Sequence, residues 1–112
     1  MKYKNKKTQV DMYLFDSVLE AKRYKQLALL ERAGEIKNLK LQVPFLLQES
    51  FRKNGKTYRK IEYIADFVYE ENGQTIVEDT KGIKTDVFKI KQKLFEYKYP
   101  KLSLKIVTRK GI

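Results

Sequence analysis

The 112-residue sequence contains no cysteine and no histidine. Without cysteine, the chain has no disulfide, no thiolate zinc site and no thiol nucleophile. Without histidine, it has no imidazole nucleophile and no imidazole general base. Any catalysis must therefore depend on carboxylates, lysine, hydroxyl groups and a hard metal ion bound through oxygen.

Long apolar runs are also missing. No stretch approaches the ~20 apolar residues that span a bilayer. The first residues are basic and lack the apolar centre of a signal peptide. We therefore expect a soluble, cytoplasmic protein that works away from the membrane.

Acidic residues are scarce relative to basic ones. The chain has 25 Lys and Arg against 14 Asp and Glu, which gives a net charge of +11 and a pI near 9.7. A basic folded protein typically binds a polyanion, because each phosphate that it neutralises releases condensed counterions. We expect nucleic acid as the partner. The alternatives are a basic surface without a specific ligand, or one that meets acidic lipid.

The length and the patterning predict one α/β domain over residues 1–112, of which residues 1–8 form a basic N-terminal arm. Capping and turn residues bound the elements, and Pro44 marks an edge strand or a bulge. The final helix and strand form a crossover, so the sheet is mixed and flanked by helices. The expected elements are, in order, a helix over 16–33, strands over 39–49, 58–69 and 74–81, a helix over 85–99, and a strand over 102–108.

Each predicted helix has an apolar face at helical spacing. In the first helix the face holds Tyr24, Leu27, Ala28 and Leu30, and Lys22, Lys25 and Arg32 are expected in solvent. In the second helix, the predicted apolar side holds Val87, Ile90, Leu94 and Tyr97.

The hairpin at Asn72-Gly73 brings two acidic residues together. A two-residue turn there pairs Glu71 with Gln74, and the same register places Asp66 opposite Asp79. Two negative charges in directly opposed positions destabilise a sheet, whereas a cation bound between them makes the arrangement favourable. Lys81 lies on the same face. The alternative is a solvated edge with an ordinary ion pair between Asp79 and Lys81, because a one-residue slip would turn both to the other face.

Glu20 supplies a third carboxylate. On the first helix it shares a side with Tyr24 and Leu27, so it points toward the sheet. Ser17-x-x-Glu20 also matches a capping box, in which the glutamate bonds the N-cap amide. Both interpretations, ligand and helix cap, stay open at this point.

These residues together resemble the signature of the PD-(D/E)XK nucleases. Ile64-Ala65-Asp66-Phe67 is followed, after a hairpin, by Val77-Glu78-Asp79-Thr80-Lys81, with Glu20 on the preceding helix. The match is closest to short phage and prophage proteins of that superfamily, and the chain is also similar to archaeal-type Holliday junction resolvases and transposon end-cleaving subunits. Alanine replaces the usual proline before Asp66, and only Asp79, not Glu78, has the required spacing to Lys81.

The resemblance implies a restriction-endonuclease-like core and a metal-dependent endonuclease acting on DNA in a phage-infected or lysogenic bacterial cell. It assigns catalysis to Glu20, Asp66, Asp79 and Lys81. One or two Mg²⁺ or Mn²⁺ ions would be held by Asp66, Asp79, the Thr80 backbone carbonyl and Glu20. It further suggests a homodimer that cuts branched DNA such as a four-way junction.

Further basic residues are candidates for contacts with phosphate. The residues after the site either contact flanking phosphates or face solvent on a helix. The residues around the Asn54-Gly55 turn either enter a groove of the DNA or form an exposed charged tip. The first group is Lys84, Lys89 and Lys91, and the second is Arg52, Lys53, Lys56, Arg59 and Lys60.

Other functions remain open on sequence grounds. A DNA-binding module without catalysis predicts salt-sensitive binding that is indifferent to Asp66 or Asp79. A nuclease subunit of a larger complex predicts activity only with its partner. An RNA-associated basic protein explains the charge but not the two facing acids.

Overall fold

The computed structural model describes residues 7–109, which form a mixed α/β domain. The expected basic arm over residues 1–8 therefore lies outside the described residues except for Lys7 and Thr8, and Thr8 already begins a strand. The elements are β1 (Thr8–Val10), β2 (Tyr13–Phe15), α1 (Val18–Arg32), β3 (Lys37–Gln48), β4 (Phe51–Lys53), β5 (Lys56–Tyr58), β6 (Ile61–Glu71), β7 (Gln74–Thr80), α2 (Asp86–Lys98) and β8 (Ser103–Val107).

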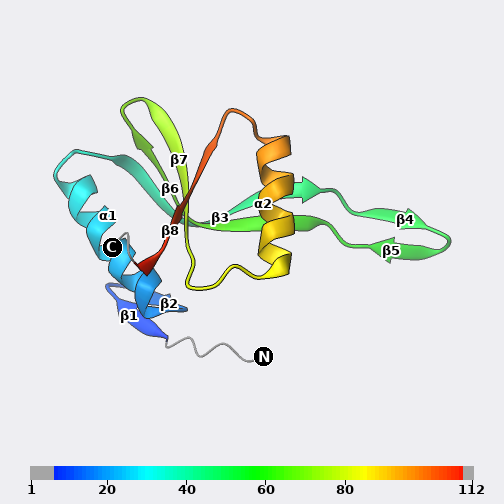
Figure 1. Cartoon of the computed structure of the whole chain (residues 1–112), viewed down its shortest axis with the longest axis horizontal. Coiled ribbons are helices and arrows are strands. Elements are labelled where there is room, and N and C mark those ends of the chain that lie inside the picture. The colour runs from blue at the N-terminus through cyan, green and yellow to red at the C-terminus, as the bar shows by residue number, and fades with distance from the viewer. Residues whose placement is uncertain (1–6, 110–112) are drawn as a thin grey trace.

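The central sheet has the strand order β3-β6-β7-β8. The first three strands are antiparallel, and β8 runs parallel to β7 after the crossover through α2. Pro44 lies in the edge strand β3, where a residue without an amide proton is tolerated. The mixed sheet, the crossover and the edge position of Pro44 are thus confirmed. Figure 1 shows α1 at one end of the sheet and α2 beside its middle.

The two helices cover different clusters of the core. Ile76 packs against the cluster under α1, and the next residue, Val77, belongs to the cluster under α2. Because neighbouring side chains in a strand point to opposite faces, the helices lie on opposite faces of this part of the sheet. Within residues 7–109, neither helix is long and apolar enough to cross a membrane.

Helix α1 matches its prediction closely. The Ser17 hydroxyl caps its first turn by accepting from the Glu20 amide at 3.1 Å, and Gly34 follows its end in the left-handed conformation at φ +80°. Tyr24 and Leu27 are buried against Phe67 and Tyr69 of β6. The three basic residues expected in solvent, Lys22, Lys25 and Arg32, are exposed.

Helix α2 begins and ends within one residue of the predicted bounds but is rotated relative to the prediction. Thr85 caps it through the Phe88 amide at 3.1 Å. Its buried side chains are Phe88 and Phe95, and Phe95 meets the ring of Tyr63 at 5.4 Å. The side that carries these two phenylalanines is buried in place of the predicted side, because large rings remove more apolar area from water. The predicted face is wrong, and its exposed fractions are 63% for Val87, 60% for Ile90, 37% for Leu94 and 87% for Tyr97.

Two hairpins turn at Asn-Gly pairs. Asn72 and Gly73 have φ of 51° and 77°, the conformation that such a two-residue turn requires. The register between β6 and β7 is the predicted one from Glu71–Gln74 to Phe67–Glu78. The pairing ends there, so Asp66 and Asp79 lie one residue beyond the last ladder pair instead of inside it.

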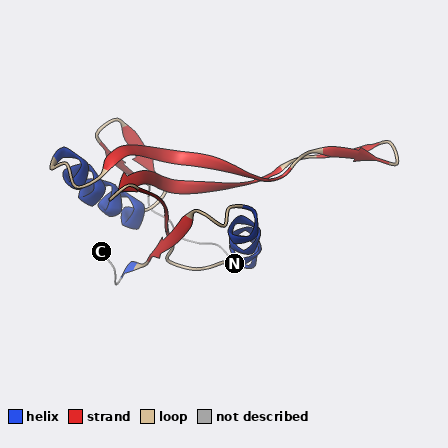
Figure 2. Ribbon diagram, turned by 90° about the horizontal axis from the view of Figure 1, so that it is seen from above, coloured by secondary structure: helices blue, strands red, loops and turns tan. Residues whose placement is uncertain are grey.

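The predicted strand over 58–69 is interrupted. Residues up to Tyr58 belong to a separate two-stranded sheet, β4–β5, which turns at Asn54-Gly55. The pairing of β6 begins at Ile61, so Arg59 and Lys60 form a break. Figure 2 shows the β4–β5 hairpin continuing outward from the long strands β3 and β6. The β1–β2 hairpin was not predicted; its turn uses Asp11 in the left-handed conformation at φ 55°.

Candidate functional site

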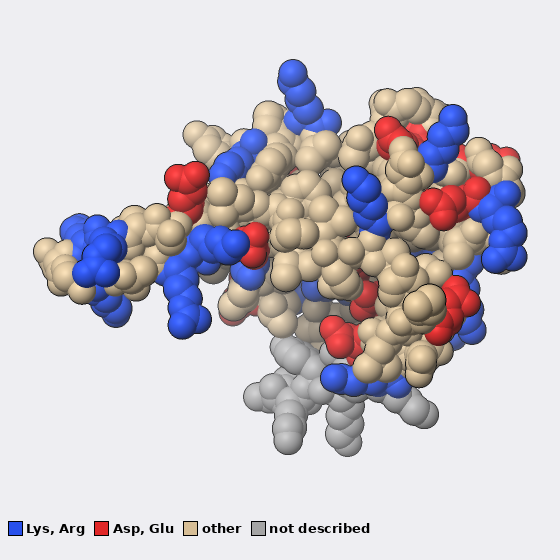
Figure 3. Space-filling model, turned by 180° about the vertical axis from the view of Figure 1, so that it is seen from behind, with Lys and Arg blue, Asp and Glu red and all other residues tan. Residues whose placement is uncertain are grey.

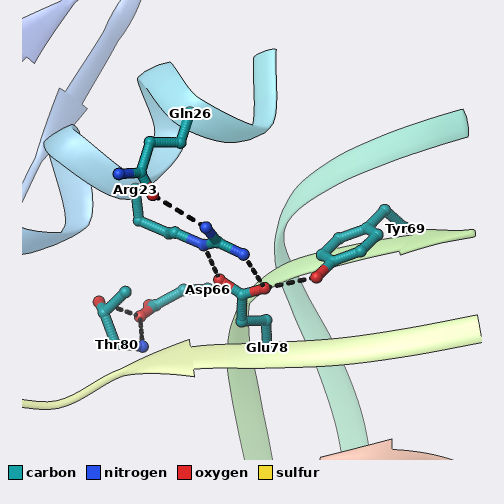
Figure 4. Close-up of polar contacts among 6 residues, drawn as sticks. All are labelled: Arg23, Gln26, Asp66, Tyr69, Glu78 and Thr80. Carbon is teal, nitrogen blue, oxygen red and sulfur yellow. Dashed lines mark hydrogen bonds and ion pairs between the residues drawn. The ribbon is translucent and has the colours of Figure 1, made fainter. Parts of the chain in front are cut away.

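Asp66 and Asp79 lie where β6 and β7 separate. The Asp66 carboxylate accepts two hydrogen bonds from Thr80, one from the amide and one from the hydroxyl, both at 2.8 Å. Figure 4 shows Asp66 reaching toward Thr80 at this point of the sheet. These two bonds bridge the strands beyond the last ladder pair and hold Asp66 beside the residue that precedes Thr80, which is Asp79.

Asp79 is buried without hydrogen bonds. Its side chain is 1% exposed, and within the described chain neither carboxylate oxygen accepts a hydrogen bond. The Lys81 ammonium approaches Oδ2 at 3.2 Å as an ion pair whose geometry is not that of a hydrogen bond. Burial, and then the Asp66 carboxylate, raise the pKa of Asp79 to about 7, while Lys81 acts in the opposite direction. A buried carboxylate in this condition is costly for the fold.

The surroundings of Asp79 add a third unsatisfied polar atom. The hydroxyl of Tyr63 is buried and has no partner in the described chain. Burial raises the pKa of Tyr63, and the Asp79 charge raises it further. Lys81 is held on the other side: its ammonium lies 4.5 Å from the centroid of the Phe88 ring, and its amide donates to the Val107 carbonyl at 3.0 Å. Strand β8 and helix α2 thus fix the lysine beside the acid.

Glu20 points toward the sheet, as predicted. It is 5% exposed, and its carboxylate accepts from the Gln42 side-chain amide at 2.8 Å. Burial, followed by the charge of Asp66, raises the pKa of Glu20 to about 7. The Ser17 hydroxyl caps the helix through the Glu20 amide, whereas the Glu20 carboxylate, which a capping box would place on the Ser17 amide, accepts from Gln42 and lies in the field of Asp66.

Gln42 reaches Glu20 because β3 is irregular there. Gln42 has φ 54°, a left-handed conformation inside a strand. It lies between the pairs Leu41–Phe67 and Val43–Ala65, which places it next to Asp66 across the ladder. Gln42 was not predicted as a partner of Glu20, since nothing in a glutamine between two apolar residues signals such a conformation.

Glu78, the neighbour of Asp79, faces the other way and is fully paired. It forms an ion pair with Arg23, whose Nη2 donates to Oε2 at 3.1 Å. The Tyr69 hydroxyl donates to the same oxygen at 2.6 Å, and Gln26 accepts from Arg23 at 2.9 Å. Figure 4 shows Arg23 descending from α1 to this carboxylate. This network was also missed, although Arg23 sits one residue from the apolar Tyr24.

The acids of this site offer only part of what a hard cation needs. Asp66 and Asp79 provide oxygen ligands, the kind that Mg²⁺ and Mn²⁺ prefer. The two unsatisfied oxygens of Asp79 fit such an ion well. Among residues 7–109, however, no group of three acidic side chains is close enough to hold a metal as it stands. Glu20, the predicted third ligand, is bonded to Gln42 instead.

The predicted phosphate contacts occupy two regions. Lys84 is exposed in the segment between β7 and α2, Lys89 is exposed on α2, and Lys91 is half-buried there. The second group surrounds the β4–β5 hairpin, and all five of its members are exposed. These are Arg52, Lys53, Lys56, Arg59 and Lys60.

The fold and the site define a small α/β domain with two facing acids and a lysine at the end of a β-hairpin. The family model described as "Protein of unknown function (DUF1064)" matches residues 1–111, and the chain belongs to that family. No curated protein and no solved structure matches the chain.

Proposed function

We propose that this protein is a metal-dependent DNA endonuclease of the PD-(D/E)XK type, with a restriction-endonuclease-like core. The observation that carries the proposal is the state of Asp79. This carboxylate is 1% exposed, accepts no hydrogen bond from the described chain and lies beside Asp66 and Lys81.

A cation explains this state better than a structural role does. Burying an ionised carboxylate without hydrogen bonds costs several kcal/mol, and a neighbouring carboxylate adds repulsion. Where the fold needs a buried acid, it supplies partners, as Arg23 and Tyr69 do for Glu78. Within the described residues, Asp79 forms an ion pair with Lys81 and lies near the Tyr63 hydroxyl, but neither of its carboxylate oxygens accepts a hydrogen bond. Such unsatisfied groups concentrate where charge is required for chemistry.

Each residue then has a role. Asp66 and Asp79, with the Thr80 carbonyl, would hold Mg²⁺ or Mn²⁺, and Glu20 would join them on release from Gln42. A cation held there would supply a water of lowered pKa and would stabilise the negative charge that builds on the scissile phosphate. Thr80 orients Asp66 through its two hydrogen bonds. Lys81 holds the attacking water and favours its deprotonated form by its charge. Cleavage at the 3′-oxygen leaves a 5′-phosphate and a 3′-hydroxyl.

DNA is the proposed substrate because of the net charge of +11. Two copies of a domain this small would supply two active sites and a wider positive surface. Symmetric cutting of branched DNA, such as a four-way junction, during phage recombination or DNA processing would suit that arrangement, and it would take place in the bacterial cytoplasm.

The test is cleavage of labelled duplex, single-stranded, flap and four-way-junction DNA with Mg²⁺, Mn²⁺ or EDTA. We expect metal-dependent cutting by the wild type, reduced at least about 100-fold in Asp79→Ala. Glu71→Gln, which changes an exposed acid on the same hairpin, is the matched control and should keep full activity. Equal cutting by wild type and Asp79→Ala would show that the site is elsewhere or that the nuclease is a contaminant.

A second candidate is a DNA-binding subunit that is inactive alone. It is favoured by the absence of three converging acids within residues 7–109. It predicts salt-sensitive DNA binding without cleavage by either protein, and binding that Asp79→Ala leaves unchanged. Activity that returns on addition of a partner chain would identify the subunit of a larger nuclease.

A further inference from the structure

Residues 51–60, which comprise β4, β5 and the two residues that follow, form a projection that we call the finger. Figures 1 and 2 show it extending away from the sheet and both helices, along the longest axis of the molecule. Every residue of the finger is exposed. The finger therefore buries nothing against the core, and the two core clusters contain none of its residues.

The finger carries charge of one sign. Five of its ten residues are Lys or Arg, and none is acidic. Lys53 and Lys56 are directly paired across the hairpin, a position in which like charges destabilise the ribbon. Figure 3 shows the basic side chains gathered around this projection. The repulsion serves no folding purpose, and a polyanionic ligand would convert it into attraction.

Other contacts keep the hairpin formed despite this repulsion. The rings of Phe51 and Tyr58 stack with centroids 4.8 Å apart and an interplanar angle of 8°. Arg52 donates to the Thr57 hydroxyl at 2.8 Å and to the Gly55 carbonyl at 3.3 Å. A two-stranded hairpin is only marginally stable in water. These contacts keep an exposed, positively charged hairpin folded, which indicates that the hairpin shape serves to bind a ligand.

The reach of the finger matches the geometry of a DNA duplex. Gln42 lies beside Asp66 in the sheet, and about twelve residues of β3 and β4 lead from it to the turn at Asn54. At ~3.3 Å per residue the path is at most about 40 Å. One turn of B-form DNA is ~34 Å, and its major groove admits a two-stranded ribbon.

We propose that the finger is a second DNA anchor, which enters the major groove about one helical turn from the phosphate held at Asp66 and Asp79. This inference rests on the proposed function and specifies its substrate as DNA with a duplex arm at least one turn long on one side of the cut. The lysines of the finger contact phosphates on both sides of the groove, and the hairpin backbone lies along it.

The test measures binding of duplexes from 8 to 24 base pairs by fluorescence anisotropy at several salt concentrations, with Ca²⁺ present so that a cation can occupy the two acids. One variant carries Lys53→Gln and Lys56→Gln. The matched control carries Lys25→Gln and Arg32→Gln, which remove the same charge from the exposed side of α1. We expect wild-type affinity to rise steeply once the duplex exceeds about one turn. In the finger variant the rise should be lost, and the slope of log K against log salt should fall by about 2, near 0.9 per phosphate contact.

The outcomes separate this inference from the proposed function. Wild-type binding that rises steadily with length, with equal salt slopes in the finger variant and the control, overturns the finger as an anchor and leaves the endonuclease standing. Wild-type protein that binds no duplex overturns both. Loss of the length dependence in the finger variant, together with metal-dependent cutting of short duplexes, supports the anchor and keeps the site assignment.

Discussion

Glu78 and Asp79 are neighbours in the sequence but have opposite environments in the fold. Glu78 is fully buried and bound by Arg23 and Tyr69. Asp79 is equally buried and lies near Lys81, another acid and the Tyr63 hydroxyl, but its oxygens accept no hydrogen bond within the described chain. The first arrangement satisfies a buried charge, and the second leaves one unsatisfied. At the level of single side chains, the fold thus uses one acid for structure and keeps the other available for a ligand.

The pH dependence of stability follows from the second acid. In the folded, metal-free protein the pKa of Asp79 is about 7, above its ordinary value of 3.8, and that of Glu20 is also about 7. Between about pH 4 and pH 7 the unfolded chain loses these protons while the folded chain keeps them. Stability therefore falls as the pH rises through this range and does not recover above it.

We expect urea unfolding in EDTA to give a free energy at least about 2 kcal/mol lower at pH 8 than at pH 5, since each unit of pKa shift is worth about 1.4 kcal/mol. Asp79→Asn should flatten this dependence, with the contribution of Glu20 remaining. An excess of Mg²⁺ or Mn²⁺ at pH 8 should stabilise the wild type and not the variant. An identical pH profile in both proteins would contradict the assignment of a raised pKa to Asp79.

Glu78, the acid that is paired, should contribute to the stability of the fold. Glu78→Ala leaves the Arg23 guanidinium and the Tyr69 hydroxyl without their partner in a buried site, which typically costs about 3–5 kcal/mol. Urea unfolding at pH 7 measures this loss, and Glu71→Gln in the exposed part of the same hairpin should stay within about 0.5 kcal/mol of wild type. A loss below about 1 kcal/mol for Glu78→Ala would mean that the network is not formed.

At the scale of the elements, the orientation of α2 is the clearest difference between sequence and structure. The helix carries two apolar stripes, one of aliphatic residues with Tyr97 and one built on Phe88 and Phe95. Spacing alone predicts a helix equally well from either stripe. Which stripe is buried depends on the face of β3 and β6 that the helix covers, where Phe45 and Tyr63 provide aromatic partners for Phe95.

Two substitutions test this orientation. Phe95→Ala removes a fully buried ring and should cost about 3–5 kcal/mol. Tyr97→Ala, at a position 87% exposed, should change stability by less than about 0.5 kcal/mol. Both are measured by chemical unfolding at constant pH. If Tyr97→Ala destabilised the protein as much as Phe95→Ala, the helix would be packed on its other face.

At the scale of the whole molecule, local signals predicted most of the fold. Ser17 and Gly34 marked the ends of α1, and the Asn72-Gly73 turn set the register that brings Asp66 near Asp79. Positive φ values were predictable at the Asn72-Gly73 pair but not at residues without such a turn signal. The β1–β2 turn uses Asp11 with positive φ, and Gln42 in β3 reaches Glu20 only through a similar distortion. Neither residue type demands that conformation.

In the candidate site, too, some features were predictable from local sequence patterns and others were not. The placement of Asp66, Asp79 and Lys81 near one another is predictable from the two-residue period of a strand and the length of the turn, both of which can be read from the sequence. The buried Tyr63 hydroxyl and the Arg23 network depend on the packing of α1 and α2 against the sheet. Such contacts join segments far apart in the chain, and a pattern within one segment does not specify them.

Because successive side chains of β7 point to opposite faces of the sheet, the length of the hairpin decides which acid faces the candidate site. The two acids occupy consecutive positions, and their opposite roles depend on which face each position presents. Deleting one residue between the Asn72-Gly73 turn and Glu78 would turn every later side chain of β7 to the opposite face, so that Asp79 and Lys81 would face Arg23 and Glu78 would point away from it. The shorter aspartate would then have to reach a guanidinium placed for a glutamate. Single-residue insertions and deletions in this segment are thus more damaging than many substitutions, because they turn both carboxylates to the opposite face without removing either.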